Sequence, residues 1–261
     1  MSAAPPLPRW LIPLAALGAA VILLPLLGLL IRADLSSFLR LITEESALVA
    51  LRLSLQTSLT ATAACVLVGI PLGLLCARSS RPGMGLLRTG VLLPLVLPPV
   101  VGGIALLYTF GRLGILGASL EAAGVQIAFT SVAVVLAQTF VSLPFMVLSV
   151  EGALRSHDAR YERVAASLGA TPTYTLRRVT LPVLAPALMT GTVLCFARAL
   201  GEFGATITFA GSLQGTTRTV PLEVYLLRET DPEGAVALSL LLVLIAAVVV
   251  GATYARSRGG R

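Results

Sequence analysis

The sequence predicts an all-α protein, a polytopic bundle of six membrane-spanning helices. The chain of 261 residues is 56% hydrophobic and only 12% charged, and a soluble domain of this length could not cover so much apolar surface. Several stretches run at least 17 residues almost without charge. That length crosses the hydrocarbon layer of a bilayer at about 1.5 Å per helical residue.

Six spans account for these stretches. The first contains "WLIPLAALGAAVILLPLLGLLI", which is longer than the roughly 7–15 apolar residues of a signal peptide and is therefore expected to be retained. No internal repeat is visible. The expected spans cover residues 10–31, 55–77, 91–110, 130–150, 183–210 and 235–254.

The arginines predict the orientation. If the amino terminus is cytoplasmic, 12 arginines fall in inner segments and 6 in outer loops, as the positive-inside rule requires. Both termini are therefore expected in the cytoplasm. The net charge of +7 is explained by the bilayer, and nucleic acid is not expected as a partner.

Residue usage excludes several kinds of site. All 19 basic residues are arginine, so the chain has no lysine for a P-loop or for a Schiff base. If ATP drives the protein, another chain holds the nucleotide. No second histidine or cysteine lies near His157, so no metal site is expected. The three cysteines are interpreted as small packing residues inside apolar spans: Cys65, Cys76 and Cys195.

A charged segment, "YERVAASLGATPTYTLRRVTLP", lies between the fourth and fifth spans. Apolar residues at i, i+3, i+4 and i+7 from Tyr161 give a short helix one apolar face. Gly169 stands where a left-handed cap would end this helix, and Thr171-Pro172 is typical of the start of a second one. The pattern alone fits either a loop resting on lipid headgroups or a docking element.

The spacing within this segment resembles a known loop. ABC importer permeases share E-A-A-x-x-x-G, nine residues, then I-x-L-P; here nine residues separate Gly169 from "VTLP". The E-A-A positions read "RVA", with Glu162 one place early. The resemblance implies that the first helix docks in a groove of a separate ATPase subunit. The residues expected to form this coupling loop are Tyr161, Glu162, Arg163, Val164, Ala165, Leu168, Gly169, Val179, Leu181 and Pro182.

Three further stretches bear on the transport path. "LPLVLPPVVGG" places prolines inside the third span, where a kink either is structural or lines a pathway. "FARALGEFGATITFAG" places an arginine and a glutamate four apart inside the fifth span, as an ion pair or as a substrate contact. In the second span, Gly69 and Gly73 are a weak signal for helix packing. The pathway candidates are Pro98, Pro99, Arg198, Glu202, Gly204, Thr206 and Thr208.

These stretches, with "TRTVPLEVYLLRETDPEGAVALSLLL", resemble the molybdate or tungstate permeases among the type I, binding-protein-dependent ABC importers, from about residue 48 onward. The resemblance implies a homodimer, two cytoplasmic ATP-binding subunits and an extracytoplasmic oxyanion-binding protein. It implies no cofactor in this chain, with ATP–Mg on the partner ATPase. The corresponding division is a start, first helix and outer loop (1–48), a permease domain (49–254, coupling loop 151–182) and a basic tail (255–261).

Alternatives stay open at this point. Sulfate/thiosulfate permeases have similar sequences at these positions but tend to use two different permease chains. An ATP-independent anion carrier would usually show inverted repeats, which are not seen. An intramembrane enzyme would need paired catalytic acids, a histidine partner for a serine, or H-E-x-x-H. The sequence does not rank molybdate over tungstate, and no high-affinity anion cage is expected.

Overall fold

A computed structural model of the chain describes residues 8–79, 81–156, 158 and 160–259, with side chains as far as Gly251. The regular secondary structure of this part is entirely helical. Five of its helical stretches are long and apolar enough to cross a membrane. They are α1 (Leu11–Arg32), α3 (Glu45–Arg78), α7 (Ser131–Ser156), the stretch Pro172–Leu200 that ends in α10 (Leu181–Leu200), and α13 (Pro232–Gly259).

The centre of the bundle is α7, which packs between α3 and α10. Small residues allow the close approach. A Cβ on Gly73 of α3 would lie 2.8 Å from the Cβ of Val150, and one on Gly69 would lie 2.9 Å from the Cγ of Met146, both on α7. The glycine pair, only a weak packing signal in the sequence, therefore does lie where α3 and α7 approach closely. α1, by contrast, has no buried residue and packs lightly on α13, so most of its apolar side chains are left for lipid or for another chain.

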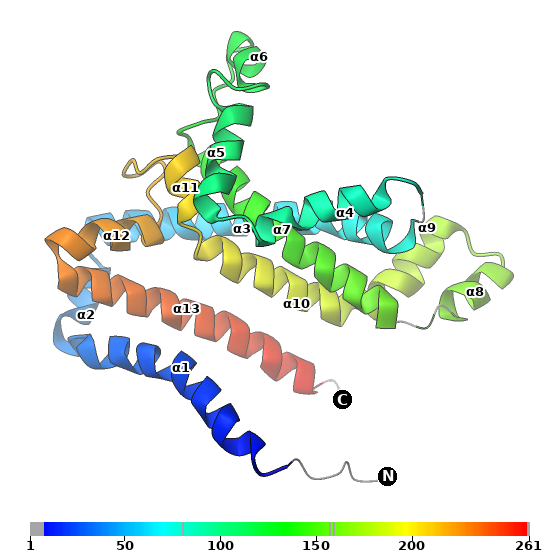
Figure 1. Cartoon of the computed structure of the whole chain (residues 1–261), viewed down its shortest axis with the longest axis horizontal. Coiled ribbons are helices and arrows are strands. Elements are labelled where there is room, and N and C mark those ends of the chain that lie inside the picture. Colours follow the sequence, from blue (N-terminus) through cyan, green and yellow to red (C-terminus); the bar gives the residue numbers. More distant parts are fainter. Residues whose placement is uncertain (1–7, 80, 157, 159, 260–261) are drawn as a thin grey trace.

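The third expected span, 91–110, is not one helix. α4 (Met84–Leu92) continues as a 3₁₀ turn over Leu93–Leu95, and α5 (Pro99–Phe110) then leaves at an angle of 118°. Consecutive prolines cause the break, because a residue before proline avoids the helical region; Pro98 is extended, with φ −54° and ψ 134°. As a result α5 and α6 (Gly117–Ala122) project away from the bundle in Figure 1.

The fifth expected span, 183–210, is also wrong at both ends. Its helix begins at Pro172, runs through α9 (Pro172–Thr175) and a π-helical turn (Leu176–Thr180) into α10, and ends at Leu200. The short α11 (Gly204–Phe209) follows a break. Hence the second helix of the charged segment is not a separate element outside the span but its first two turns.

The bundle has two dissimilar ends (Figure 1). At one end lie α8 (Arg160–Ser167), α9 and the carboxyl-terminal end of α13. At the other lie α2 (Leu35–Ile42) and α12 (Val220–Thr230).

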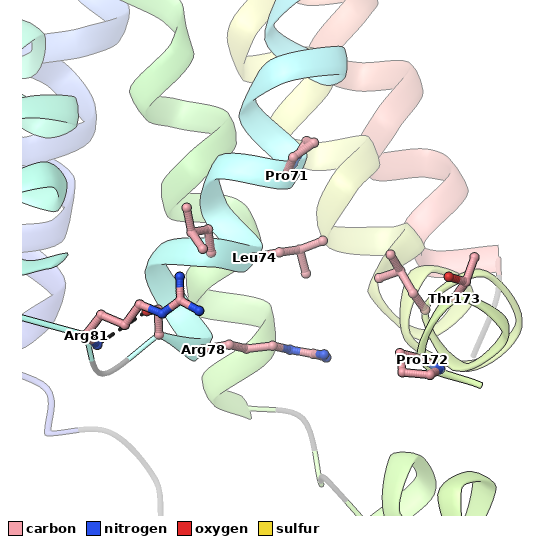
Figure 2. Close-up of a pocket in the computed structure, with 9 residues that line it drawn as sticks. Pro71, Leu74, Arg78, Arg81, Pro172 and Thr173 are labelled. Atoms are coloured by element: carbon pink, nitrogen blue, oxygen red, sulfur yellow. Dashed lines mark hydrogen bonds between the residues drawn. The ribbon is translucent and has the colours of Figure 1, made fainter. Parts of the chain in front are cut away.

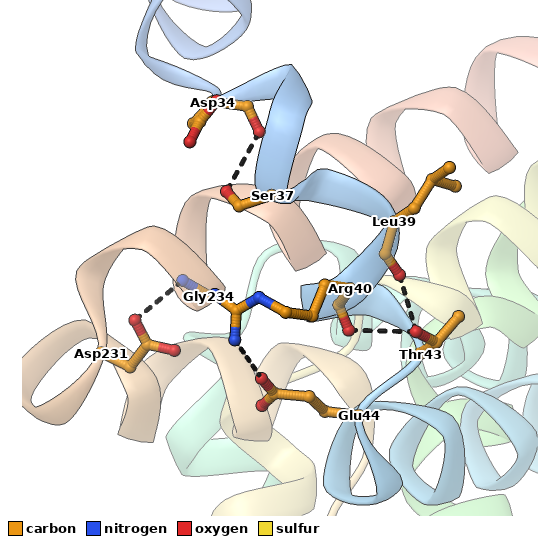
Figure 3. Close-up of polar contacts among 8 residues, drawn as sticks. All are labelled: Asp34, Ser37, Leu39, Arg40, Thr43, Glu44, Asp231 and Gly234. Carbon is orange, nitrogen blue, oxygen red and sulfur yellow. Dashed lines mark hydrogen bonds and ion pairs between the residues drawn. The ribbon is translucent and has the colours of Figure 1, made fainter.

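Figure 3 shows how the second of these ends is tied down by local polar contacts. Asp34 caps α2, and the hydroxyl and N–H of Ser36 lower the pKa of its carboxyl group. The Gly234 N–H donates to Asp231 at 3.1 Å and so caps the start of α13.

Candidate functional site

The charged segment folds as a helix, a tight turn and a second helix start. α8 ends in a Schellman arrangement, in which Gly169 N–H donates to Ala166 O and Ala170 N–H to Ala165 O, each at 3.0 Å. Gly169 has φ +83°, a conformation that glycine adopts without strain. Thr171 then caps α9 by accepting the Tyr174 N–H at 3.3 Å. The turn chemistry predicted at Gly169 and Thr171 is confirmed.

Glu162 joins α8 to two other helices. Its carboxylate forms an ion pair with Arg78, in the last turn of α3, and accepts a hydrogen bond of 2.6 Å from the hydroxyl of Thr180. Thr180 is fully buried at the end of the π-helical turn. A charge-assisted hydrogen bond and an ion pair on one carboxylate fix the orientation of a short helix. The glutamate that stands one place early in the motif therefore has partners within its own chain.

The rest of α8 faces away from the bundle. Tyr161, Val164 and Leu168 expose 63%, 57% and 82% of their surface, and Arg163 is also exposed. Around the turn, residues from Ala165 to Tyr174 line a shallow hollow of about 520 Å³. The predicted apolar face thus exists, and the described residues leave it exposed. Val179 and Leu181 are half-buried and Pro182 is exposed, all within the continuous helix that leads into α10.

Two helix breaks meet where α5 leaves the bundle. The break before α5 and the break before α11 lie against each other, because a Cβ on Gly204 would come within 2.6 Å of the Cβ of Pro99. One turn along α5, a Cβ on Gly103 would lie 2.8 Å from Ala205 O. The structure therefore brings Pro99 and Gly204 together, although about 100 residues separate them in the sequence.

The pair predicted in the fifth span forms at this second break. Arg198, in the last turn of α10, makes an ion pair with Glu202, which lies beyond the helix end. Glu202 is only 1% exposed, and its other carboxylate oxygen accepts the Ala205 N–H at 2.7 Å. The sequence left an ion pair or a substrate contact open; in the structure Glu202 is paired with Arg198 and also accepts a hydrogen bond from the first turn of α11.

The remaining pathway candidates lie on α11, just beyond the second break. Thr206 is fully buried with an unpartnered hydroxyl, and Thr208 donates to Gly204 O at 2.8 Å. Sequence reasoning missed two further buried polar side chains without partners on α7, Gln138 and Ser142. Their only signal was polarity within an apolar span.

A second buried carboxylate was also missed. Glu151, near the end of α7, accepts a hydrogen bond from Nε of Arg88 at 3.0 Å and forms an ion pair with its Nη2 at 2.8 Å. These contacts tie α4 to α7. One of its oxygens is buried without a partner. A glutamate at the end of an apolar span was the available signal, since such a charge needs a partner.

The described residues give no metal-binding group of three or more His, Cys, Asp or Glu side chains. The cysteines at 65, 76 and 195 are buried free thiols, and Cys195 donates to Ser142 O at 3.2 Å, as expected for packing residues. His157 lies outside the described residues.

Comparisons with known proteins agree with this architecture. Residues 69–258 match the family described as binding-protein-dependent transport system inner membrane component. The molybdenum transport system permease protein ModB of Mycobacterium tuberculosis (strain ATCC 25618 / H37Rv) is 58% identical, over 96% of this chain and 95% of its own. The sulfate transport system permease protein CysW of Synechococcus elongatus (strain ATCC 33912 / PCC 7942 / FACHB-805) is 33% identical, over 95% and 93%.

The fold is shared with a solved structure as well. A chain of a bacterial ABC transporter involved in the import of the acidic polysaccharide alginate superimposes with a TM-score of 0.70, over 95% of each chain, at 18% identity. At that identity the likeness concerns the fold alone. An all-helical, multi-pass membrane architecture is thus common to this chain and to its structural neighbour.

Proposed function

This chain belongs to the family of binding-protein-dependent transport system inner membrane components, and from that membership we propose that it is the membrane-spanning permease subunit of an ATP-driven importer whose cargo is molybdate. The carrying observation is the 58% identity to a molybdenum permease along almost the whole chain, against 33% for a sulfate permease. Molybdate and tungstate are both tetrahedral dianions, so tungstate is expected to share the path.

The finer assignments form part of the same proposal. ATP–Mg is held by two cytoplasmic subunits, because this chain has no lysine for a P-loop. An extracytoplasmic binding protein selects the oxyanion, and two copies of the permease form the channel. Residues 49–254 form the transport domain.

The segment 151–182 is proposed as the contact with the ATPase. Three observations support this: the uncovered apolar face of α8, the capped turn at Gly169, and the Glu162 carboxylate that ties α8 to α3 and to the π-helical turn. An exposed apolar helix face is suited to a groove on another protein. This end of the bundle is then cytoplasmic, and so is the carboxyl-terminal end of α13 (Figure 1).

Movement of a docked α8 would reach the bundle through Glu162 and along the helix that ends at Leu200. There it meets the Arg198–Glu202 pair and the contact between Gly204 and Pro99. We propose that the two adjoining breaks form the gate, because unwound backbone at membrane depth is tolerated only where protein or a water-filled path surrounds it.

Co-purification tests the docking assignment. Leu168→Asp places a charge on the apolar face of α8 and is expected to abolish retention of the ATPase subunits. Leu213→Asp is the matched control, an equally apolar side chain that is 62% exposed in the loop before α12, and it should retain them. Equal retention by both variants would remove α8 from the interface.

Uptake tests the cargo and the energy source. Proteoliposomes that contain the whole complex should take up labelled molybdate only with ATP, and excess sulfate should not compete. Uptake that continues without ATP but with an ion gradient would identify a secondary carrier. Competition by sulfate as strong as that by tungstate would favour the sulfate alternative.

A further inference from the structure

A second hollow, of about 740 Å³, opens between the end of α3 and the start of the helix that becomes α10 (Figure 2). It lies at the same end of the bundle as α8, and Arg78 extends across it from α3 toward Pro172 and Thr173. The nine residues that line it are Pro71, Leu74, Leu75, Arg78, Ser79, Arg81, Pro172, Thr173 and Leu176.

The lining is divided along the helix axis. Pro71, Leu74 and Leu75 belong to the apolar part of α3, whereas Arg78 and Arg81 follow at and beyond its last turn. Leu176 continues the apolar wall on the opposite helix. A site with an apolar wall and cations at its mouth matches the acyl chain and the phosphate of a phospholipid in chemistry.

The charge at the mouth is only partly neutralised. Arg78 shares Glu162 with Thr180, but no acidic side chain of the described residues pairs with Arg81. A net positive mouth disfavours a zwitterionic headgroup relative to one with a net negative phosphate.

We propose that this hollow binds an anionic phospholipid of the inner leaflet, with its phosphate on Arg78 and Arg81 and an acyl chain against the α3 leucines. The position in the inner leaflet rests on the orientation in the proposed function. Because Arg78 also holds Glu162, the bound lipid contacts the same arginine that fixes α8. The lipid therefore acts on the segment proposed to contact the ATPase.

Native mass spectrometry of the purified complex in mild detergent tests the site directly. Phosphatidylglycerol and phosphatidylcholine of equal chain length are titrated against wild type, Arg81→Gln, the double variant with Arg78→Gln, and Arg228→Gln. The last is the matched control, an exposed arginine at the other end of the bundle.

Wild type should bind phosphatidylglycerol more tightly than phosphatidylcholine. Each surface arginine contributes about 1 kcal/mol to binding of an anionic lipid, so Arg81→Gln should weaken phosphatidylglycerol about fivefold and the double variant about 25-fold. Arg228→Gln should leave the affinity for phosphatidylglycerol unchanged. The affinity for phosphatidylcholine should be the same in all three variants as in the wild type. Arg81 makes no ion pair in the described part of the wild type, so the melting temperature of Arg81→Gln should equal that of the wild type.

Equal binding of the two lipids by wild type, or equal losses in Arg81→Gln and Arg228→Gln, would overturn the assignment. Another outcome would also overturn it: calorimetry shows that the wild type binds free molybdate or inorganic phosphate and that Arg81→Gln does not. The hollow would then be a site for a free oxyanion. These readouts need no transport. Failure of the lipid site therefore leaves the proposed function untouched, and loss of ATP-dependent uptake by wild type would leave the lipid site standing.

Discussion

Replacing Arg198 by alanine should damage this protein more than replacing its partner. Arg198→Ala leaves the Glu202 carboxylate 1% exposed and without its cation, with the hydrogen bond from the Ala205 N–H still in place. Glu202→Gln instead leaves an arginine whose side chain is still 30% exposed. The amide oxygen of glutamine can also keep the bond to Ala205.

The magnitudes follow from burial. Removing one partner of a buried ion pair costs about 3–5 kcal/mol, because the other charge stays buried and unpaired. Arg198→Ala should reach this range and lower the melting temperature by about 10 °C. Glu202→Gln should cost about 1–2 kcal/mol, since Arg198 can reach water. The double variant buries no charge at all, so it should recover about 2 kcal/mol relative to Arg198→Ala.

Two measurements check this order. Thermal unfolding of the two single variants and the double variant in one detergent gives a double-mutant cycle for stability. ATP-dependent molybdate uptake by the reconstituted complex compares the same variants in function, and we expect Arg198→Ala to lose most uptake at equal expression.

Wild-type melting temperature and wild-type uptake in Arg198→Ala would refute the reasoning, because the buried carboxylate would then tolerate the loss of its cation. Strictly additive losses in the double variant would refute it equally, since they would mean that the two side chains do not stabilise each other.

Three further outcomes are expected. Gly73→Leu should lower the free energy of unfolding by about 3 kcal/mol and so lower the melting temperature, because even a Cβ there would lie 2.8 Å from the Cβ of Val150; an unchanged melting temperature would mean that α3 and α7 can separate freely. Gly169→Ala should cost about 1 kcal/mol through its φ of +83° and reduce ATPase retention severalfold in a pull-down, whereas full retention would show that the turn geometry does not matter for docking. Glu162→Gln keeps an acceptor for Thr180 but loses the ion pair, so ATP hydrolysis should persist while molybdate carried per ATP falls about threefold; a wild-type ratio would exclude this carboxylate from coupling.

The features predicted best from the sequence are those that depend on residues close together in the chain. The cap at Gly169 and the helix start at Thr171 depend on local backbone preferences, so each could be assigned from a few letters. Long apolar runs likewise located five of the expected spans, although several ends were displaced, and the third run proved to be two helices bent by 118°. The positions of these features needed no knowledge of the tertiary structure.

What could not be predicted depends on contacts between distant segments. Nothing local to Glu162 indicates that Arg78 and Thr180 are its partners. The break after Leu200 likewise depends on Glu202 capping a new helix against α5, where the apolar pattern alone favours an uninterrupted span to residue 210. Hydropathy indicates which segments lie in the bilayer. It does not indicate where a helix breaks because another helix packs against it.

The helix from Pro172 to Leu200 has one further consequence. Its 29 residues form one continuous helical stretch about 40 Å long, with a wide π turn near its first end and Pro186 within α10. A stiff rod stores little strain between its tips. A push of a few ångströms at Pro172 would therefore reappear beside Glu202, at the opposite end of this helix.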